Sequence, residues 1–219
     1  MAFVGIISCA CLTVMGLGVA NAQTVLNPSF ELDVLSPGGY TSGNGTVTDW
    51  SSTTTGFGNG IQYFTTDNFD SASPLPAPAD GNQALYIFAG DVYQDVGALQ
   101  SNTTYTLTLA LGSRLDQPGN GIFELINGID NTGTVLAVSP TITPTAGTFE
   151  LETLTYSTGS DVSGDLTIDL ESGGTGQAIF DNIQLTAQSV PEPSSLALLF
   201  IGLSGIGVMV RSYRMSQNS

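Results

Sequence analysis

The chain has 219 residues, of which 19 are acidic, 3 are basic and none is histidine, so its net charge at neutral pH is −16. Such an acidic surface repels phosphate backbones, which excludes nucleic acid as a partner. The missing histidine excludes histidine-based catalysis and histidine metal sites, and the missing lysine excludes a serine–lysine nucleophile. The excess of carboxylates favours divalent cations as ligands, although it also serves solubility outside the cell.

The first 22 residues predict a signal peptide. The stretch from Ala2 to Val19 is apolar, and Ala20-Asn21-Ala22 fits the small-x-small cleavage rule. Both cysteines, Cys9 and Cys11, lie in this segment. The mature protein is therefore expected to begin at Gln23, to be exported, and to contain no disulfide even in an oxidising compartment.

Residues 23–189 have the size of one domain, and they carry 18 acidic residues against Arg114 alone. Their hydrophobic pattern has a period of two, which is typical of β-strands. The clearest cases are residues 105–111 and 166–170, where leucine, isoleucine or tyrosine alternates with small or polar residues. Further strands are predicted at residues 25–32, 61–65, 84–88, 92–96, 122–126, 134–138, 149–156 and 178–185.

Turn signals rich in glycine, asparagine and proline separate these strands, and no stretch of the domain has a helical period. About ten short strands at this spacing predict an all-β fold, a two-sheet antiparallel sandwich of jelly-roll type. The apolar alternation in residues 149–156 changes phase after Leu151, which predicts a β-bulge or a strand that leaves one sheet for the other.

The last thirty residues have three successive parts. Val190-Pro191-Glu192-Pro193 comes first, an apolar run from Ser194 to Val210 follows, and Arg211 and Arg214 end it. As a helix the apolar run would be roughly 25 Å long, enough to cross a thin hydrocarbon core. The two arginines place the C-terminus in the cytoplasm by the positive-inside rule, so residues 23–189 would lie on the other side of the membrane.

This pattern in residues 190–219 resembles a PEP-CTERM sorting signal. The resemblance implies an exported protein held in the inner membrane of a Gram-negative bacterium until an exosortase cuts near Pro191-Glu192-Pro193 and releases it to the cell surface or exopolysaccharide matrix. An ordinary membrane anchor is the competing interpretation. The glycines and serines within the run would make it a weak permanent anchor, which favours the sorting interpretation.

Short motifs in the domain resemble those of the galactose-binding-domain-like sandwiches, which include many carbohydrate-binding modules. These motifs, in chain order, are Leu26-Asn27-Pro28-Ser29-Phe30-Glu31, Trp50, Tyr93-Gln94-Asp95-Val96, Thr103-Thr104-Tyr105-Thr106-Leu107 and Phe180-Asp181-Asn182-Ile183-Gln184-Leu185. In this group the first and last motifs lie side by side and often share a structural calcium ion. The resemblance implies Glu31 and Asp181 as its side-chain ligands; the alternative is that both face water or accept hydrogen bonds from backbone amides.

Aromatic side chains are candidates for stacking on a sugar ring. The plausible members of such a platform are Trp50, Tyr63, Tyr86 and Tyr93. A single tryptophan after a turn in a sandwich is more often buried between the sheets, so a core position is favoured for Trp50.

Glycoside hydrolysis would need two carboxylates at a defined separation, and with 18 acids no spacing singles out a pair. The pairs Asp67/Asp70 and Asp91/Asp95 are interpreted as solvated charge. The sequence therefore predicts no catalytic residues and no enzyme. It predicts an exported, exosortase-processed surface or matrix protein, with a carbohydrate-binding module as the first alternative and a glycan hydrolase as the second. Its expected partners are exosortase, the inner membrane before processing and exopolysaccharide.

Overall fold

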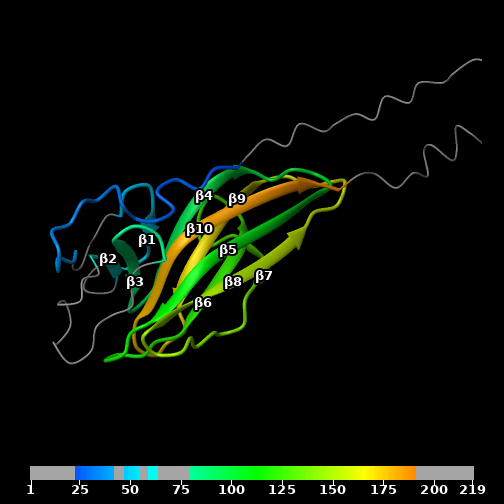
Figure 1. Cartoon of the computed structure of the whole chain (residues 1–219). Coiled ribbons are helices and arrows are strands. Elements are labelled where there is room, and N and C mark those ends of the chain that lie inside the picture. Colours follow the sequence, from blue (N-terminus) through cyan, green and yellow to red (C-terminus); the bar gives the residue numbers. More distant parts are fainter. Residues whose placement is uncertain (1–22, 42–46, 55–58, 64–78, 191–219) are drawn as a thin grey trace, which may run out of the picture.

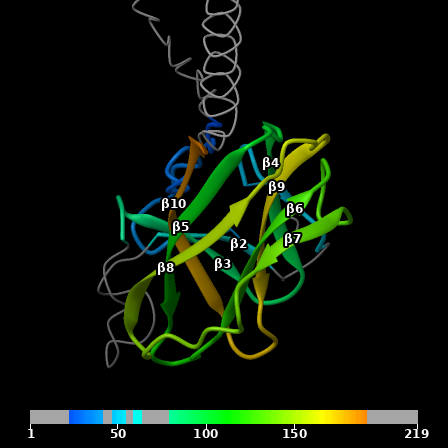
Figure 2. The ribbon, with the colours of Figure 1, turned by 90° about the vertical axis from the view of Figure 1, so that its right-hand side faces the viewer.

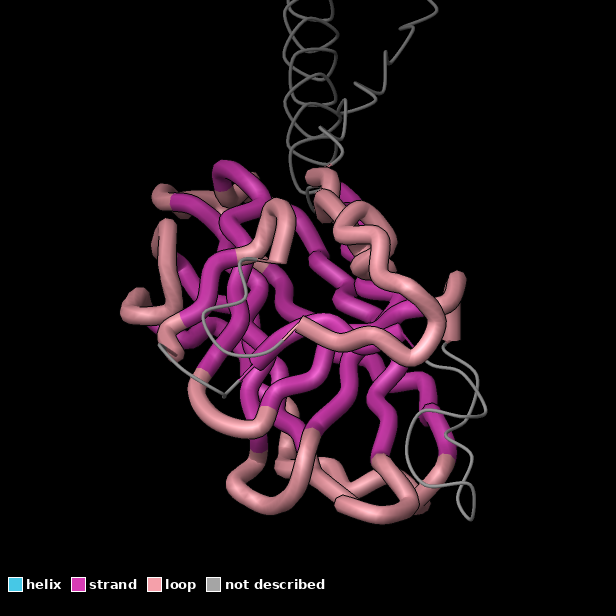
Figure 3. Tube along the Cα trace, turned by 90° about the vertical axis from the view of Figure 1, so that its left-hand side faces the viewer, coloured by secondary structure: helices cyan, strands magenta, loops and turns pink. Residues whose placement is uncertain are grey.

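A computed structural model describes residues 23–41, 47–54, 59–63 and 79–190, and these residues form ten β-strands and no helix (Figures 1 and 3). The strands are β1 (Ser51–Ser52), β2 (Asn59–Tyr63), β3 (Gln83–Ile87), β4 (Asp91–Ala98), β5 (Thr103–Ser113), β6 (Gly121–Asn127), β7 (Thr134–Val138), β8 (Thr148–Ser157), β9 (Asp165–Ser172) and β10 (Ala178–Ser189). In this part of the chain, no helix is long and apolar enough to cross a membrane. The signal peptide predicted at residues 1–22 and the membrane helix predicted at residues 194–210 lie outside the described residues.

The strands form two five-stranded sheets, which pack as a sandwich (Figure 2). Sheet A has the order β2-β3-β10-β5-β8 and sheet B the order β1-β4-β9-β6-β7, and every strand pair is antiparallel. Successive strands largely alternate between the sheets, as in a jelly roll. The predicted all-β, two-sheet antiparallel fold is confirmed.

The core lies between the sheets and is built by the alternation seen in the sequence. Leu107, Leu109 and Leu111 of β5 point into it from sheet A, and the apolar positions of β9 point into it from sheet B. Because successive side chains of a strand face opposite sides, this arrangement sends Thr167, Asp169 and Glu171 of β9 to the outer face of sheet B.

The strand predicted at residues 25–32 is wrong. This segment has no regular structure, because Asn27 (φ 46°) and Phe30 (φ 58°) adopt positive φ values that no strand allows, and Pro28 has no amide hydrogen to donate. The segment is instead held by other residues. Gln94 exchanges two hydrogen bonds with the backbone of Leu26, and the carbonyl of Pro28 accepts one from the amide of Ile183 at 2.9 Å.

The bulge predicted in residues 149–156 is also wrong, because β8 pairs with β5 without any register shift from Thr148 to Ser157. The apolar pattern changes phase because Phe149 and Leu151 face away from the main core, where Leu151 is 76% exposed, whereas Leu154 and Tyr156 pack against that core. The register shift in sheet A occurs instead between Asp181 and Gln184 of β10, where Asn182 has a φ of 50°. At this shift β10 accepts the N-terminal segment through the Ile183–Pro28 hydrogen bond.

Candidate functional site: an acidic face on sheet B

The outer face of sheet B brings acidic residues of three strands together. Tyr93 of β4 lies opposite Asp169 of β9, and Asp169 lies opposite Glu124 of β6. Asp91 and Glu171 form the next row toward one end of the sheet. Directly opposed side chains of antiparallel strands have Cβ atoms about 5 Å apart, so the carboxylates of these rows are neighbours.

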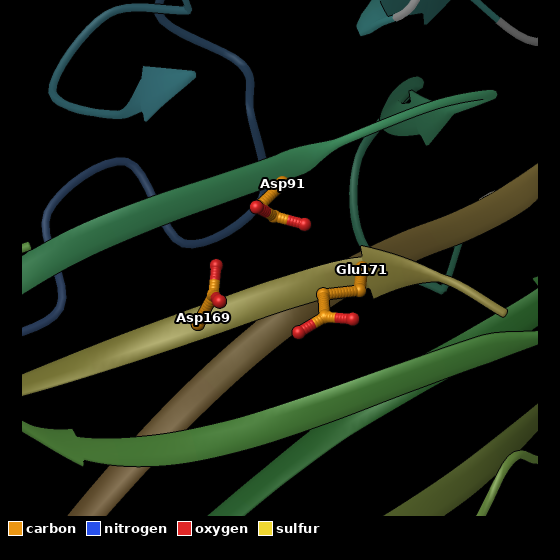
Figure 4. A group of neighbouring side chains, drawn as sticks. All are labelled: Asp91, Asp169 and Glu171. Atoms are coloured by element: carbon orange, nitrogen blue, oxygen red, sulfur yellow. The ribbon is translucent and has the colours of Figure 1, made fainter. Parts of the chain in front are cut away.

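Carboxylate oxygens of Asp91, Asp169 and Glu171 all lie within 4.8 Å of one another (Figure 4). Asp91 and Glu171 are half-buried, whereas Asp169 is only 2% exposed. Among the described residues, this is the one group of three metal-ligating side chains that are so close. We name Asp91, Asp169 and Glu171 the acidic cluster.

The loop of residues 128–133, which joins β6 to β7, closes over part of this face. The carbonyl of Gly128 accepts a hydrogen bond from Thr167 Oγ1 at 2.7 Å, and Asn131 Nδ2 donates one to Asp91 Oδ2 at 2.8 Å. Thr53, just after β1, also donates to Asp91 Oδ2. These contacts hold the Asp91 carboxylate in place and help to remove Asp169 from water.

Burial, followed by the charges of Asp91, Glu171 and Glu124, raises the pKa of Asp169 to about 8. The pKa values of Glu171 and Glu124 are raised too, in both cases chiefly by burial and further by the charge of Asp91. No cation compensates. Arg114, the single basic side chain of the described residues, donates to Asp116 and to Gln177 Oε1. The acidic cluster therefore brings three carboxyl groups together where burial and mutual repulsion disfavour their charged forms.

The two residues implied as calcium ligands, Glu31 and Asp181, bind the same loop that precedes β3. Asp181 is fully buried, and its Oδ2 accepts a hydrogen bond from the amide of Asp80 at 2.8 Å. Glu31 Oε1 accepts from the amides of Asn82 and Gln83, each at 2.6 Å. Burial raises the pKa of Asp181 to about 7, against the lowering effect of its own hydrogen bonds from backbone amides, among them those of Asp80 and Asn182.

Beside this loop lies a pocket of about 340 Å³. It is lined by Asn27, Pro28, Ser29, Glu31, Leu32 and Asp80. Ser29 Oγ donates to Asp80 Oδ2 at 2.6 Å, so two carboxylates, Glu31 and Asp80, border the same space.

The proposed aromatic platform does not form as a unit. Trp50 is 6% exposed, packs on Phe30 with ring centroids 5.5 Å apart, and donates from Nε1 to the carbonyl of Leu26 at 3.1 Å. It is a core residue and offers no free ring face. Tyr86 is 7% exposed, and its hydroxyl donates to the carbonyl of Thr41.

Tyr93 and Tyr63 complete the set of aromatic candidates. Tyr93 is half-buried on the outer face of sheet B beside the acidic cluster. Tyr63 ends β2, and its side chain is outside the description.

Among the sorting residues, Val190 is half-exposed and its amide donates to the carbonyl of Asn102 at 2.6 Å. Pro191, Glu192, Pro193, Arg211 and Arg214 lie outside the described residues.

The sequence does not predict the acidic cluster, because its pattern indicates solvated charge for Asp91 and Asp95. Alternation within β9 placed Asp169 and Glu171 on one face, but which strand lies beside β9 cannot be seen from alternation. The informative signal was a run of three acids, Asp165, Asp169 and Glu171, within a strand whose other face is apolar.

The raised pKa of Asp169 gives a pH dependence in metal-free protein. Between about pH 4 and about pH 8 the folded state keeps a proton on Asp169 that the unfolded chain has released, so the free energy of unfolding should fall as the pH rises. Asp169→Asn should remove much of this fall and should be more stable than the wild type at about pH 9 by at least about 1 kcal/mol. Chemical denaturation at several pH values with a chelator measures this.

Asp95→Asn, on the same strand as Asp91 but exposed, is the matched control and should keep the wild-type slope. If the Asp169→Asn and wild-type stability curves run parallel over the whole pH range, Asp169 does not hold a raised pKa.

Comparison with known proteins gives two family matches. Residues 21–186 match the model of the HpiC1-like family, described as HpiC1 cyclase, and residues 189–214 match the PEP-CTERM protein-sorting motif. No curated protein matches the chain.

Several solved structures are similar to this chain at low sequence identity. The enzymatically active domain of tailspike protein 4 of bacteriophage CBA120 is 12% identical with a TM-score of 0.46, over 76% of this chain and 21% of that chain. The CBM22-1 xylan-binding domain of Xyn10C from Paenibacillus barcinonensis is 15% identical with a TM-score of 0.44, over 71% and 96%. TmCBM61, solved with β-1,4-galactotriose, is 16% identical with a TM-score of 0.43, over 75% and 97%.

Likenesses at this level carry no functional assignment, so the family matches decide the classification. The HpiC1-like model covers nearly the whole sandwich, and the sorting motif begins at the residue where β10 ends. The chain therefore belongs to the HpiC1-like family, described as HpiC1 cyclase, and carries a PEP-CTERM protein-sorting motif directly after its β-sandwich.

Proposed function

We propose that the protein is an exported exosortase substrate that acts, without catalysis, as a component of the cell surface or exopolysaccharide matrix. The observation that carries this proposal is the junction between the sandwich and the sorting motif. β10 ends at Ser189, and the sorting motif spans residues 189–214, so no linker separates the folded domain from the sorting motif. Before cleavage the sandwich would be held close to the inner membrane with the C-terminus in the cytoplasm, and afterwards it would be released outward.

The acidic face of sheet B suits contact with an external ligand. The amide of Val190 bonds to the carbonyl of Asn102, and Gln23 Nε2 bonds to the carbonyls of Gly97 and Ala98, so Gln23 and Val190, the first and last described residues, both lie at the end of the sandwich where β4 finishes (Figure 2). β4 starts at Asp91, so the acidic cluster lies toward the opposite end. In the tethered state this arrangement would turn the cluster away from the membrane.

A neutral polysaccharide is the ligand class that this face would bind. Carboxylates accept hydrogen bonds from sugar hydroxyls, and the half-buried ring of Tyr93 can pack on the apolar side of a sugar. An anionic polymer would be repelled, because the domain carries 18 acidic residues and one arginine.

A second candidate function is catalysis of a cyclisation. Two observations favour it: the family is described as a cyclase, and the pKa of Asp169 is raised to about 8, so that its carboxyl group is protonated at neutral pH. A buried neutral carboxylic acid can give a proton to a reacting carbon atom, which is general acid catalysis.

We further propose that Glu31 and Asp181 support a structural calcium ion near the loop that precedes β3. The pocket bordered by Glu31 and Asp80, together with the backbone carbonyls of the irregular segment at residues 26–32, offers the oxygen ligands that calcium prefers. A calcium ion here would tie the N-terminal segment to sheet A.

Binding to a neutral polysaccharide tests the main proposal. The full chain should be retained on neutral extracellular polysaccharide purified from the producing cells, and Tyr93→Ala should weaken binding roughly tenfold, since one aromatic contact contributes on the order of 1 kcal/mol. Tyr40→Ala is the matched control, because Tyr40 is 62% exposed and is not among the residues of the acidic face. Equal binding of both variants, or no retention of the wild type, would contradict the assignment to this face.

The cyclase candidate makes a different prediction. Proton-catalysed cyclisation conserves mass, so incubation with a small-molecule extract of the producing cells should create isomers of unchanged mass if the protein is a catalyst. Asp169→Asn should abolish their formation, whereas Asp95→Asn should not. Chromatography with mass spectrometry measures this, and the absence of new isomers with the wild type would remove the cyclase candidate.

The calcium proposal is tested by thermal unfolding. Saturating calcium should raise the melting temperature of the full chain by about 5–10 °C over chelated protein, because ligand at a hundredfold excess over Kd contributes about 2.7 kcal/mol. Glu31→Gln should reduce this increase. Glu150→Gln should not, although Glu150 also accepts a hydrogen bond from a backbone amide, that of Thr145, through Oε1. An unchanged response of Glu31→Gln would refute Glu31 as a ligand.

A further inference from the structure

The acidic cluster has a geometry that fits one metal ion. Its three carboxylates come from two adjacent strands, β4 and β9, and one oxygen of each lies within 4.8 Å of the others. Oxygen ligands of calcium lie about 2.3–2.6 Å from the ion, so two of them can be separated by up to roughly 5 Å. For magnesium, with shorter bonds of about 2.1 Å, the limit is roughly 4.2 Å.

Asp169 gives an independent indication of a ligand. Its side chain is 98% buried, since the residue is only 2% exposed, and its Oδ1 has no hydrogen-bond partner among the described residues. A buried polar oxygen without a partner costs roughly 1–3 kcal/mol, and more when the group is charged. In Figure 4, Asp169 points toward Asp91 on the neighbouring strand. The side chain that carries the unpartnered oxygen therefore belongs to the cluster.

The residues that the structure describes supply no cation that could take this role. Arg114 is bound to Asp116 and Gln177, and the chain has no lysine or histidine. Glu124, on the strand at the other side of β9, adds a further carboxylate rather than a partner. A bound cation is the remaining way to neutralise the cluster in its charged form.

We propose that Asp91, Asp169 and Glu171 bind a divalent hard cation of the calcium class on the outer face of sheet B. Asn131 Nδ2 and Thr53 Oγ1 donate hydrogen bonds to Asp91 Oδ2 and so fix the orientation of the Asp91 carboxylate. Water or a ligand's hydroxyl groups fill the rest of the coordination shell. The site is separate from the calcium proposed at Glu31 and Asp181, since Asp181 belongs to sheet A.

The proposal stands independently of polysaccharide binding. If the protein binds calcium at the cluster but no polysaccharide, the metal site remains and only the proposed function fails. If it binds polysaccharide equally well in chelator and in calcium, the function remains and the cation has no part in it.

Calorimetric titration of the full chain with calcium chloride tests the site. The double variant Asp91→Asn/Glu171→Gln should lose one bound calcium ion per chain or bind it at least about tenfold more weakly, because it lacks two of three charged ligands. Asp169→Asn should show the same loss. Asp95→Asn, which removes an acid from the same strand outside the cluster, should bind as the wild type does.

Two further measurements keep the result decisive. Glu31→Gln should retain the ion that the double variant loses, which distinguishes the two sites. Melting in chelator shows whether each variant is folded, and at about pH 9 Asp169→Asn should melt no lower than the wild type, because it removes a buried charge. The proposal is overturned if the folded double variant binds calcium with wild-type stoichiometry and affinity, or if the wild type binds none.

Discussion

The constraint on which the domain depends is the placement of many carboxylates in a protein with almost no cations. Eighteen acidic residues share a single arginine in the sandwich and its N-terminal segment, and that arginine is committed to Asp116 and Gln177. Exposed acids are stabilised by water, but Asp181 and Asp169 are buried. Each buried carboxylate needs hydrogen-bond donors, a cation or a proton.

The two buried acids meet this need in different ways. Asp181 lies where β10 shifts register, and backbone amides at Asp80 and Asn182 point at its oxygens. Asp169 lies in a regular part of β9, where the backbone amides take part in sheet pairing, and the hydrogen bond from the amide of Leu170 lowers the pKa of Asp169 by less than any other effect shifts it. The register shift thus explains why one carboxylate is satisfied by the chain itself and the other is not.

The sequence predicted the sandwich well because its strands alternate clearly, and residues 134–138 even coincide with β7. Prediction failed for residues 25–32, which form an irregular segment held by hydrogen bonds with the side chains of Gln94 and Trp50. The two-residue strand β1 was also missed, since two serines have no periodicity.

The acidic cluster could be predicted only in part. Alternation places Asp169 and Glu171 on one face, but the neighbour of β9 is β4, more than seventy residues earlier in the chain. Non-local pairing of this kind depends on how the whole jelly roll closes, which local patterns do not encode. The same topology separates the cluster from Gln23 and Val190, the first and last described residues, which lie at the opposite end of the sandwich.

The central claim is that Asp91, Asp169 and Glu171 form a cation site, and anomalous X-ray diffraction tests it most directly. Crystals of the protein grown with calcium, and then exchanged into manganese, should show an anomalous peak within about 2.6 Å of an oxygen of each carboxylate. The account would be contradicted by a map without a peak there and with Asp169 hydrogen-bonded as a neutral acid to Asp91 or Glu171.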